Sequence, residues 1–270
     1  MERSDRIRCL ARSVISAQIG VYAANAAFFI LLSVFPAMML LIGLLQYTPI
    51  TPTDLQRALS GFLPQALSPL LDYMTQELFA MNSVGLLSFS AVFAVWSSSR
   101  GVYSLIRGIN NVYHIQQTQN YLLLRLRSAL DTVLLLLALI ATLILHLFGR
   151  ELGVRLEQQG LVFLPSLFRM NHLFILIVLT ALFSVFYTRF PHRKQTLKSA
   201  LPGAVFTALG WTVFSVLFTF YVSKAGNFSL YYGSLSVMIL TMLWLYVCMC
   251  IFFYGGMLNY FLQKRRKNQN

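Results

Sequence analysis

The sequence has little charge for its length and very little acid. Of its 270 residues 11% are charged, and 8 acidic residues stand against 21 lysines and arginines. A soluble chain carries roughly 25% charged residues, so this composition excludes an ordinary cytosolic enzyme and a disordered regulator. The 3 cysteines show no paired or metal-ligand spacing, which excludes a secreted disulfide scaffold.

Apolar residues, in contrast, are abundant. Hydrophobic residues make up 57% of the chain, aromatic residues 14%, and the mean hydropathy is +0.68. A helix needs about 20 mostly apolar residues to cross a bilayer. Six segments satisfy this: residues 23–45, 84–105, 130–148, 173–190, 201–222 and 232–262. We therefore predict an all-α integral membrane protein, with one polytopic domain over residues 1–270 and six transmembrane helices.

Segments between the spans predict short amphipathic helices on the outer side. A capping-box pattern at residues 53–56 opens one helix, which Pro64 should end. Residues 68–79 then place apolar side chains on one helical face and polar side chains on the other, and residues 150–159 suggest a shorter helix of this kind. Helices of this type lie on a membrane surface or cap a bundle.

Lysine and arginine are distributed unevenly between the two sides of the predicted membrane domain. Sixteen lie in the two tails and in or beside the connections after the second and fourth spans, and five lie in the alternate connections. Because cytoplasmic segments carry the excess of Lys and Arg, we predict that both termini are cytoplasmic. This topology explains the net charge of +13 without a nucleic-acid partner.

Short motifs within the spans carry a family resemblance. They are Leu32-Ser-Val-Phe-Pro36, Trp96-Ser-Ser-Ser-Arg-Gly101, Ile109-Asn-Asn-Val-Tyr113, Leu201-Pro-Gly-Ala204, Tyr232-Gly-Ser234, Leu243-Trp-Leu-Tyr246 and Gly255-Gly-Met-Leu-Asn259. In this order they resemble the YihY/BrkB family, often labelled ribonuclease BN-like. The resemblance implies six helices in the bacterial cytoplasmic (inner) membrane and says little about activity. One departure is Met257, which stands where the family usually has an acid.

A ribonuclease label conflicts with the residues that are present. Metal-assisted RNA cleavage needs clustered carboxylates and histidines near the phosphate. The predicted cytosolic side has three acids, Glu2, Asp5 and Asp131, and the four histidines are scattered along the chain. We therefore expect no enzymatic activity, no catalytic residues, no metal site and no cofactor.

A polar stripe on the second span is the clearest candidate for a functional surface. Arg100, Tyr103, Arg107 and the pair Asn110/Asn111 recur at spacings of three and four residues, so they share one helical face. An arginine fork binds two oxygens of a phosphate or carboxylate. The alternative is that these arginines snorkel to the cytoplasmic boundary without binding a ligand.

Asp131 is the second candidate, because ionisable residues at membrane depth are costly and often functional. It lies at the start of the third span, four residues after Arg127. One interpretation is an ion pair with Arg127 at a helix N-terminus. The other is that neighbouring second and third spans bring Arg100, Arg107, Asn111 and Asp131 together. We predict these four residues as the ligand-binding site, with Asp131 orienting the arginines.

Two functions remain open from the sequence. The first is a transporter or translocator of a lipid or another anionic amphiphile or solute, because a basic cytoplasmic rim attracts anionic headgroups. The second is a non-transporting membrane scaffold or assembly partner, for which the polar residues would be paired inside a closed bundle. Anionic membrane lipids are the expected partners, nucleic acid is not, and a homo-oligomer is left open.

The topology can be tested with reporter fusions. We expect fusions at residues 60 and 225 to report the outer side and a fusion at residue 195 to report the cytoplasm, since the charge bias is spread over four segments. Paired reporters that are active on opposite sides of the membrane make the measurement. Finding residue 195 outside would contradict the topology.

Overall fold

The structure, a computed structural model, describes residues 16–45, 53, 64, 72, 84–115, 126, 128–131, 171–192, 195–224 and 234–267. Its long elements are α2 (Ile19–Leu45), α5 (Val84–Val112), α8 (Asn171–Arg189), α9 (Leu197–Lys224) and α11 (Ser234–Lys267). The described part of the chain is helical and holds no strand. The predicted all-α membrane fold is therefore confirmed.

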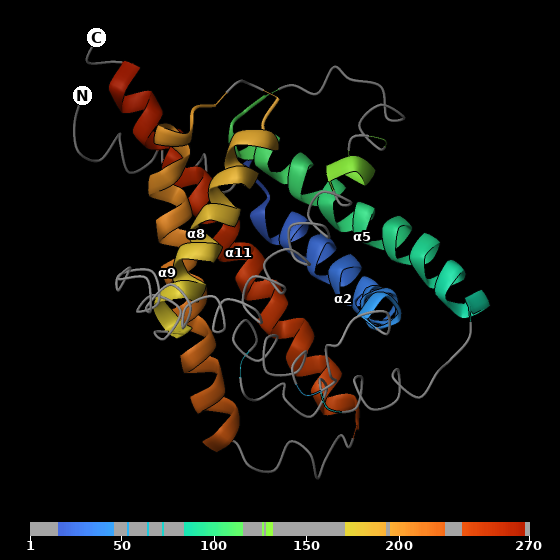
Figure 1. Cartoon of the computed structure of the whole chain (residues 1–270). Coiled ribbons are helices and arrows are strands. Elements are labelled where there is room, and N and C mark those ends of the chain that lie inside the picture. The colour runs from blue at the N-terminus through green and yellow to red at the C-terminus, as the bar shows by residue number, and fades with distance from the viewer. Residues whose placement is uncertain are drawn as a thin grey trace, which may run out of the picture.

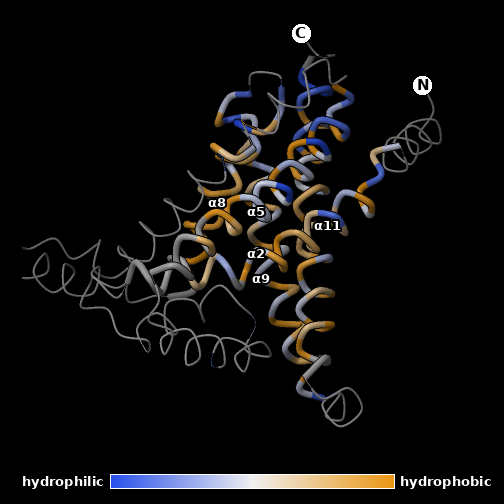
Figure 2. Tube along the Cα trace, turned by 90° about the vertical axis from the view of Figure 1, so that its right-hand side faces the viewer, coloured by the Kyte–Doolittle hydropathy of each residue, from blue (hydrophilic) through white to orange (hydrophobic). Residues whose placement is uncertain are grey.

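The described helices run in both directions through the bundle. The ends of α5, α8 and α11 and the start of α9 gather at one end of the molecule (Figure 1). The start of α2 lies there too, since the Asn111 side chain at the end of α5 bonds to the main chain of Ala17. Hydrophilic residues concentrate at this end, as Figure 2 shows for the last turns of α11 and the turn before α9. We call it the polar end.

Helices α2 and α5 form one half of the bundle and pack through small residues. Ala23, Ala26 and Ala27 of α2 are fully buried. A Cβ added to Gly101 of α5 would lie 3.1 Å from the Ile30 side chain. The Ser104 hydroxyl also donates to the carbonyl of Tyr22 across the pair, at 3.1 Å. Small residues and interhelical hydrogen bonds are typical of helix packing in lipid, where hydrophobic burial no longer drives association.

Helix α11 joins this half to α8 and α9, and its approach to α9 is very close. Gly203 of α9 and Gly255 of α11 face each other backbone to backbone, with no room for a Cβ on either residue. Asn259 completes the crossing: its Oδ1 accepts from the Gly203 N–H at 2.7 Å and its Nδ2 donates to the Ala200 carbonyl at 2.9 Å. Because Pro202 lies inside α9, the backbone bonding of that turn is incomplete, and Asn259 bonds to main-chain groups on both sides of the proline.

An aromatic cluster around Phe252 binds α8 to α11. The Phe252 ring stacks on Tyr187 with centroids 5.0 Å apart, and the rings of Phe183, Phe186 and Phe190 surround it. The Tyr187 hydroxyl donates to the Phe252 carbonyl at 2.5 Å and lies 2.7 Å from the Thr207 hydroxyl of α9. One buried tyrosine therefore ties three helices together.

The helix bounds agree with five of the six predicted spans. Residues Ile19–Met39, Leu197–Lys224 and Val237–Arg266 are long and apolar enough to cross a membrane, and Ile175–Arg189 is a shorter apolar helix. Helix α5 extends seven residues beyond the predicted end at residue 105. The third span, predicted at 130–148, and the outer amphipathic helices lie outside the described residues except for residues 53, 64, 72, 130 and 131. The count of six spans stays a prediction.

The glycine crossing yields a stability prediction. Replacing Gly255 with alanine should lower the free energy of unfolding by about 1–3 kcal/mol, because the added methyl group overpacks a fixed backbone contact. The matched control is Gly20→Ala on α2, where the nearest atom to the new Cβ is the Tyr246 hydroxyl at 3.3 Å. Thermal unfolding in detergent measures both variants. Equal melting temperatures for the two would show that the crossing is not tight.

Candidate functional site

The last turn of α5 is closed by a Schellman motif that projects polar residues into the polar end. The N–H of Ile115 donates to the Asn110 carbonyl at 2.9 Å and the N–H of His114 to the Asn111 carbonyl at 3.0 Å. His114 has a φ of 52°, the left-handed conformation that glycine usually supplies at this position. The helix thus ends with its last carbonyls satisfied.

Asn110, which is fully buried, fixes the chain that leaves α8. Its Oδ1 accepts from the main-chain N–H of His192 at 2.9 Å, and its Nδ2 lies 2.6 Å from Nδ1 of the His192 ring. Because the amide nitrogen is a donor, this geometry makes Nδ1 of His192 an acceptor. The pair joins α5 to the α8–α9 connection.

Asn111, one of the predicted ligand-binding residues, holds the start of α2. Its Nδ2 donates to the carbonyl of Ala17 at 2.9 Å and to that of Ser16 at 3.3 Å. Gln18, the residue before the start of α2, has a φ of 47°, so the chain turns sharply as it enters the helix. The bonds recorded for Asn111 therefore position a helix start.

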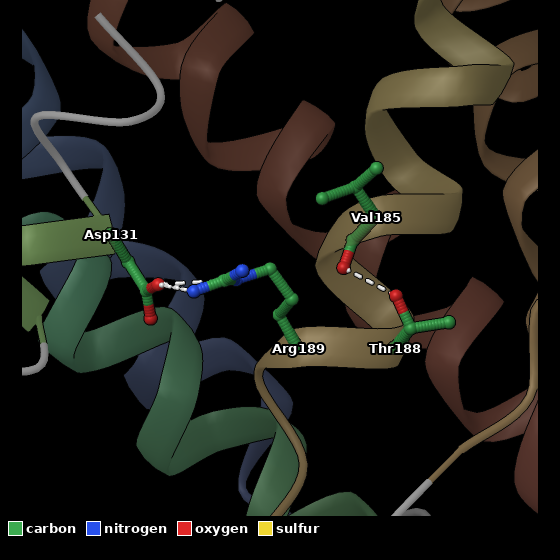
Figure 3. A network of polar contacts seen from close by, with 4 residues as sticks. All are labelled: Asp131, Val185, Thr188 and Arg189. Atoms are coloured by element: carbon green, nitrogen blue, oxygen red, sulfur yellow. Dashed lines mark hydrogen bonds and ion pairs between the residues drawn. The ribbon is translucent and has the colours of Figure 1, made fainter.

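Asp131 is buried and pairs with Arg189 at the end of α8. Its Oδ1 lies 3.1 Å from Nη2 and 3.3 Å from Nε of the guanidinium, and 5% of the Asp131 side chain is exposed against 56% for Arg189 (Figure 3). The pair links two segments of the chain at the polar end. A buried carboxylate that loses its partner is strongly destabilising, so this pair fixes where the end of α8 lies.

Arg100 and Arg107 are exposed on one face of α5. The Arg100 guanidinium lies over the rings of Trp96 and Phe29, 4.9 Å and 5.3 Å from their centroids. That of Arg107 lies 5.5 Å from the Tyr103 centroid. Toward the other end of the helix the same face exposes Phe89, Val92 and Trp96. We call residues 89, 92, 96, 100, 103 and 107 the α5 face, which changes from apolar to basic along its length.

The serines that precede Arg100 are turned back onto the helix. Ser97 donates to the Phe93 carbonyl at 2.7 Å and Ser99 to the Trp96 carbonyl at 2.9 Å, and Ser98 bonds to the Ala94 carbonyl. Side-chain bonds of this kind compete with the backbone ladder and often bend a helix. They also satisfy the hydroxyl groups without an outside ligand, so the exposed polar groups of the α5 face are those of residues 100–107.

The charge at the polar end is strongly positive. Among the described residues, exposed cations there are Arg107, Arg189, Lys198, Lys264, Arg265 and Arg266. The acid described at this end is Asp131, which already faces Arg189. The end of the bundle therefore presents a basic rim to anionic groups.

Three of the four predicted ligand-binding residues lie on α5, and Asp131 lies in a separate segment. Arg100 and Arg107 share the α5 face, whereas the bonds recorded for Asn111 and Asp131 go to the start of α2 and the end of α8. Sequence reasoning missed three polar residues that organise this region: His192, Arg189 as the partner of Asp131, and Asn259. Asn259 could have been found from the sequence, because an amide side chain in an apolar span needs hydrogen-bond partners within the protein.

Two further findings concern metal binding and the departure at Met257. Within the described ranges, no group of three His, Cys, Asp or Glu residues could hold a metal ion. Met257, where the family resemblance led us to expect an acid, is buried in the core with 3% of its surface exposed. This chain fills that position with an apolar side chain.

The chain is similar to bacterial membrane proteins over nearly its whole length. It is 32% identical over 249 residues to the ribonuclease-like protein YfkH of Bacillus subtilis, covering 91% of this chain and 90% of that protein. It is 22% identical to a UPF0761 membrane protein of Haemophilus influenzae, over 84% of both chains. With a UPF0761 membrane protein of Bordetella petrii it shares 23% identity over 87% of this chain and 52% of that one. No solved structure matches the chain significantly.

A family model assigns these similarities to one group. The model described as "Virulence factor BrkB" matches residues 10–270. This range includes every long helix described above and the whole of the α5 face and the polar end. The chain therefore belongs to the BrkB family of membrane proteins.

Proposed function

We propose that the protein is a translocator of anionic amphiphiles in the bacterial cytoplasmic membrane, with both termini in the cytoplasm. Its ligand is a lipid or a related molecule that has an anionic headgroup and an apolar chain. Arg100 and Arg107 of the α5 face contact the headgroup. Asn111 and Asp131 act as positioning residues, which hold the ends of the neighbouring helices around that face.

The observation that carries this proposal is that Arg100 is exposed. It lies seven residues before Arg107, which is about 10.5 Å along the helix axis, on the side of α5 that leads away from the polar end. A charged side chain at such depth is costly in lipid unless it meets water, a counter-charge or a polar ligand. The rings of Trp96 and Phe29 offset part of that cost, and an anionic headgroup would offset more.

The gradient along the α5 face fits an amphiphile. Phe89, Val92 and Trp96 are exposed at one end, where an acyl chain can pack. The arginines follow at the end nearer the basic rim. Each basic residue near a membrane surface attracts anionic lipid by about 1 kcal/mol, so the rim would concentrate the ligand at the arginine end of this face.

A scaffold without transport is the second candidate, and a specific observation favours it. The polar side chains inside the described bundle that organise its crossings are satisfied by protein groups, as Asn110, Tyr187, Thr207 and Asn259 show. A closed and internally paired bundle is what a scaffold requires. The two candidates differ in what the α5 face does.

Lipid movement in proteoliposomes tests the proposal. We expect the wild type to move fluorescent phosphatidylglycerol across the bilayer faster than protein-free vesicles. Arg100→Ala should slow this movement about tenfold, since a hydrogen bond to a charged group contributes about 1.5–3 kcal/mol. Dithionite quenching of the outer leaflet gives the rate.

Lys224→Ala is the matched control. The Lys224 ammonium lies 4.9 Å from the Phe220 centroid, so the variant also removes a cation from an aromatic ring, but at the far end of α9. It should leave the rate unchanged. If the wild type moves lipid no faster than protein-free vesicles, the scaffold is favoured. If Arg100→Ala and Lys224→Ala slow lipid movement equally, the α5 face has no special role in it.

A further inference from the structure

We propose that His192 is a pH-sensitive latch, which holds the α8–α9 connection against the end of α5 while its ring is neutral and releases the connection when Nδ1 takes up a proton. The latch lies where the end of α5 meets the turn between α8 and α9 (Figure 1). This inference goes beyond the proposed function, because it concerns how two parts of the bundle are joined and does not require that anything cross the membrane.

The Asn110 amide bonds to two atoms of His192, and together the two bonds fix which way the amide points. The main-chain N–H of His192 is a donor, so the amide atom that lies 2.9 Å from it is the acceptor Oδ1. The other end of the amide is therefore Nδ2, and it lies 2.6 Å from Nδ1 of the ring. Since an amide nitrogen only donates, Nδ1 carries no proton in this arrangement.

A proton on Nδ1 of His192 cannot be accommodated by turning the amide. If the Asn110 amide flips so that Oδ1 accepts from the protonated Nδ1, its Nδ2 meets the main-chain N–H of His192, and two donors face each other. If the amide stays as it is, Nδ2 and the protonated Nδ1 are the two donors that face each other. Protonation therefore removes one of the two hydrogen bonds in either orientation.

The two residues of the latch differ in burial, and this difference decides which of them moves. Asn110 is fully buried, whereas His192 is half-buried. A protonated His192 ring can turn toward water, but the Asn110 amide stays in the interior and keeps a polar group without its partner. Because such a group destabilises the arrangement that contains it, the connection is held less firmly against α5 when His192 is charged.

Other titratable and charged groups at the polar end influence the pH at which the proton binds. Those described on the neighbouring elements are Arg107, Tyr113 and His114 of α5, Tyr187 and Arg189 of α8, Lys198 of α9, Lys264, Arg265 and Arg266 of α11, and Asp131. The cations oppose a further positive charge, whereas the Asp131 carboxylate and the C-terminal ends of α5 and α8 favour it. An unperturbed histidine titrates at about pH 6.5, so we expect the latch to respond between pH 7.5 and pH 5.5.

Thermal unfolding of the full chain in detergent at pH 7.5 and pH 5.5 tests the latch. We expect the wild-type melting temperature to fall by roughly 5 °C between the two pH values, because a buried hydrogen bond is lost. The sign follows from proton binding: the latched chain excludes a proton that the unfolded chain accepts at His192, so stability falls as the pH falls. A wild-type melting temperature that is equal at both pH values would overturn the proposal.

His192→Asn removes the titration and keeps the acceptor, because Oδ1 of asparagine occupies the same place along the side chain as Nδ1 of histidine. This variant should match the wild-type melting temperature at pH 7.5 and lose most of the fall at pH 5.5. His114→Asn is the matched control: it changes an exposed histidine of the same end, and asparagine tolerates its left-handed conformation, so the wild-type fall should remain. Equal falls in the wild type and His192→Asn, or loss of the fall in His114→Asn, would contradict the latch.

Hydrogen exchange of the wild type adds a measurement that needs no variant. After correction for the intrinsic pH dependence of exchange, amide protection in the peptide that contains His192 should fall at pH 5.5, while protection around Gly203 and Gly255 stays the same. Unchanged protection of the His192 peptide would overturn the latch. The outcome is independent of lipid movement: Arg100→Ala can lose movement with the pH response intact, and His192→Asn can lose the pH response with movement intact.

Discussion

The close crossing of α9 and α11 at Gly203 and Gly255 is the constraint on which the rest of the arrangement depends. Lipid tails are as apolar as the side chains, so moving an apolar side chain from lipid into a helix interface contributes little free energy. Helices in a membrane therefore associate through close backbone packing and interhelical hydrogen bonds. Asn259 supplies such bonds to α9 on both sides of Pro202, and Tyr187 brings α8 to the same place through Thr207 and the Phe252 carbonyl. Helix α11 then carries this pair against α2 and α5. The crossing therefore sets how α8, α9 and α11 lie against one another.

Side-chain contacts at the polar end add to what the crossing fixes. Asn110 holds His192, Asn111 holds the start of α2, and Asp131 holds Arg189. Each contact joins segments that are far apart in the sequence. Each also gives a hydrogen-bond or ion-pair partner to a polar group whose burial without one would be costly. Arg100, Arg107 and the cations of the last turns of α11 are exposed. The exposure of these basic groups is the reason for the proposed roles of the α5 face and the basic rim as binding surfaces.

Hydropathy predicted the helical architecture because it acts over whole segments. Five described helices coincide with predicted spans. Partner choice was not predictable in the same way. Arg127 lies four residues before Asp131, a spacing that predicts contact on a helix. The ion pair that the structure describes is with Arg189, which becomes a neighbour through the tertiary packing of α8. The bonds of Asn259 likewise depend on how closely two glycines let the backbones approach, and no local pattern encodes that distance.

The most direct measurement of the role of the α5 face is photo-crosslinking in native membranes. A lipid with an anionic headgroup and a photoactivatable group near that headgroup would be compared with its phosphatidylcholine counterpart, and the adducts would be mapped by mass spectrometry. We expect adducts from the anionic lipid to concentrate around residues 96–107 of α5 and to be lost in Arg100→Ala but not in Lys224→Ala. Equal labelling by both lipids, or adducts spread evenly over all the helices, would contradict an anionic ligand on this face.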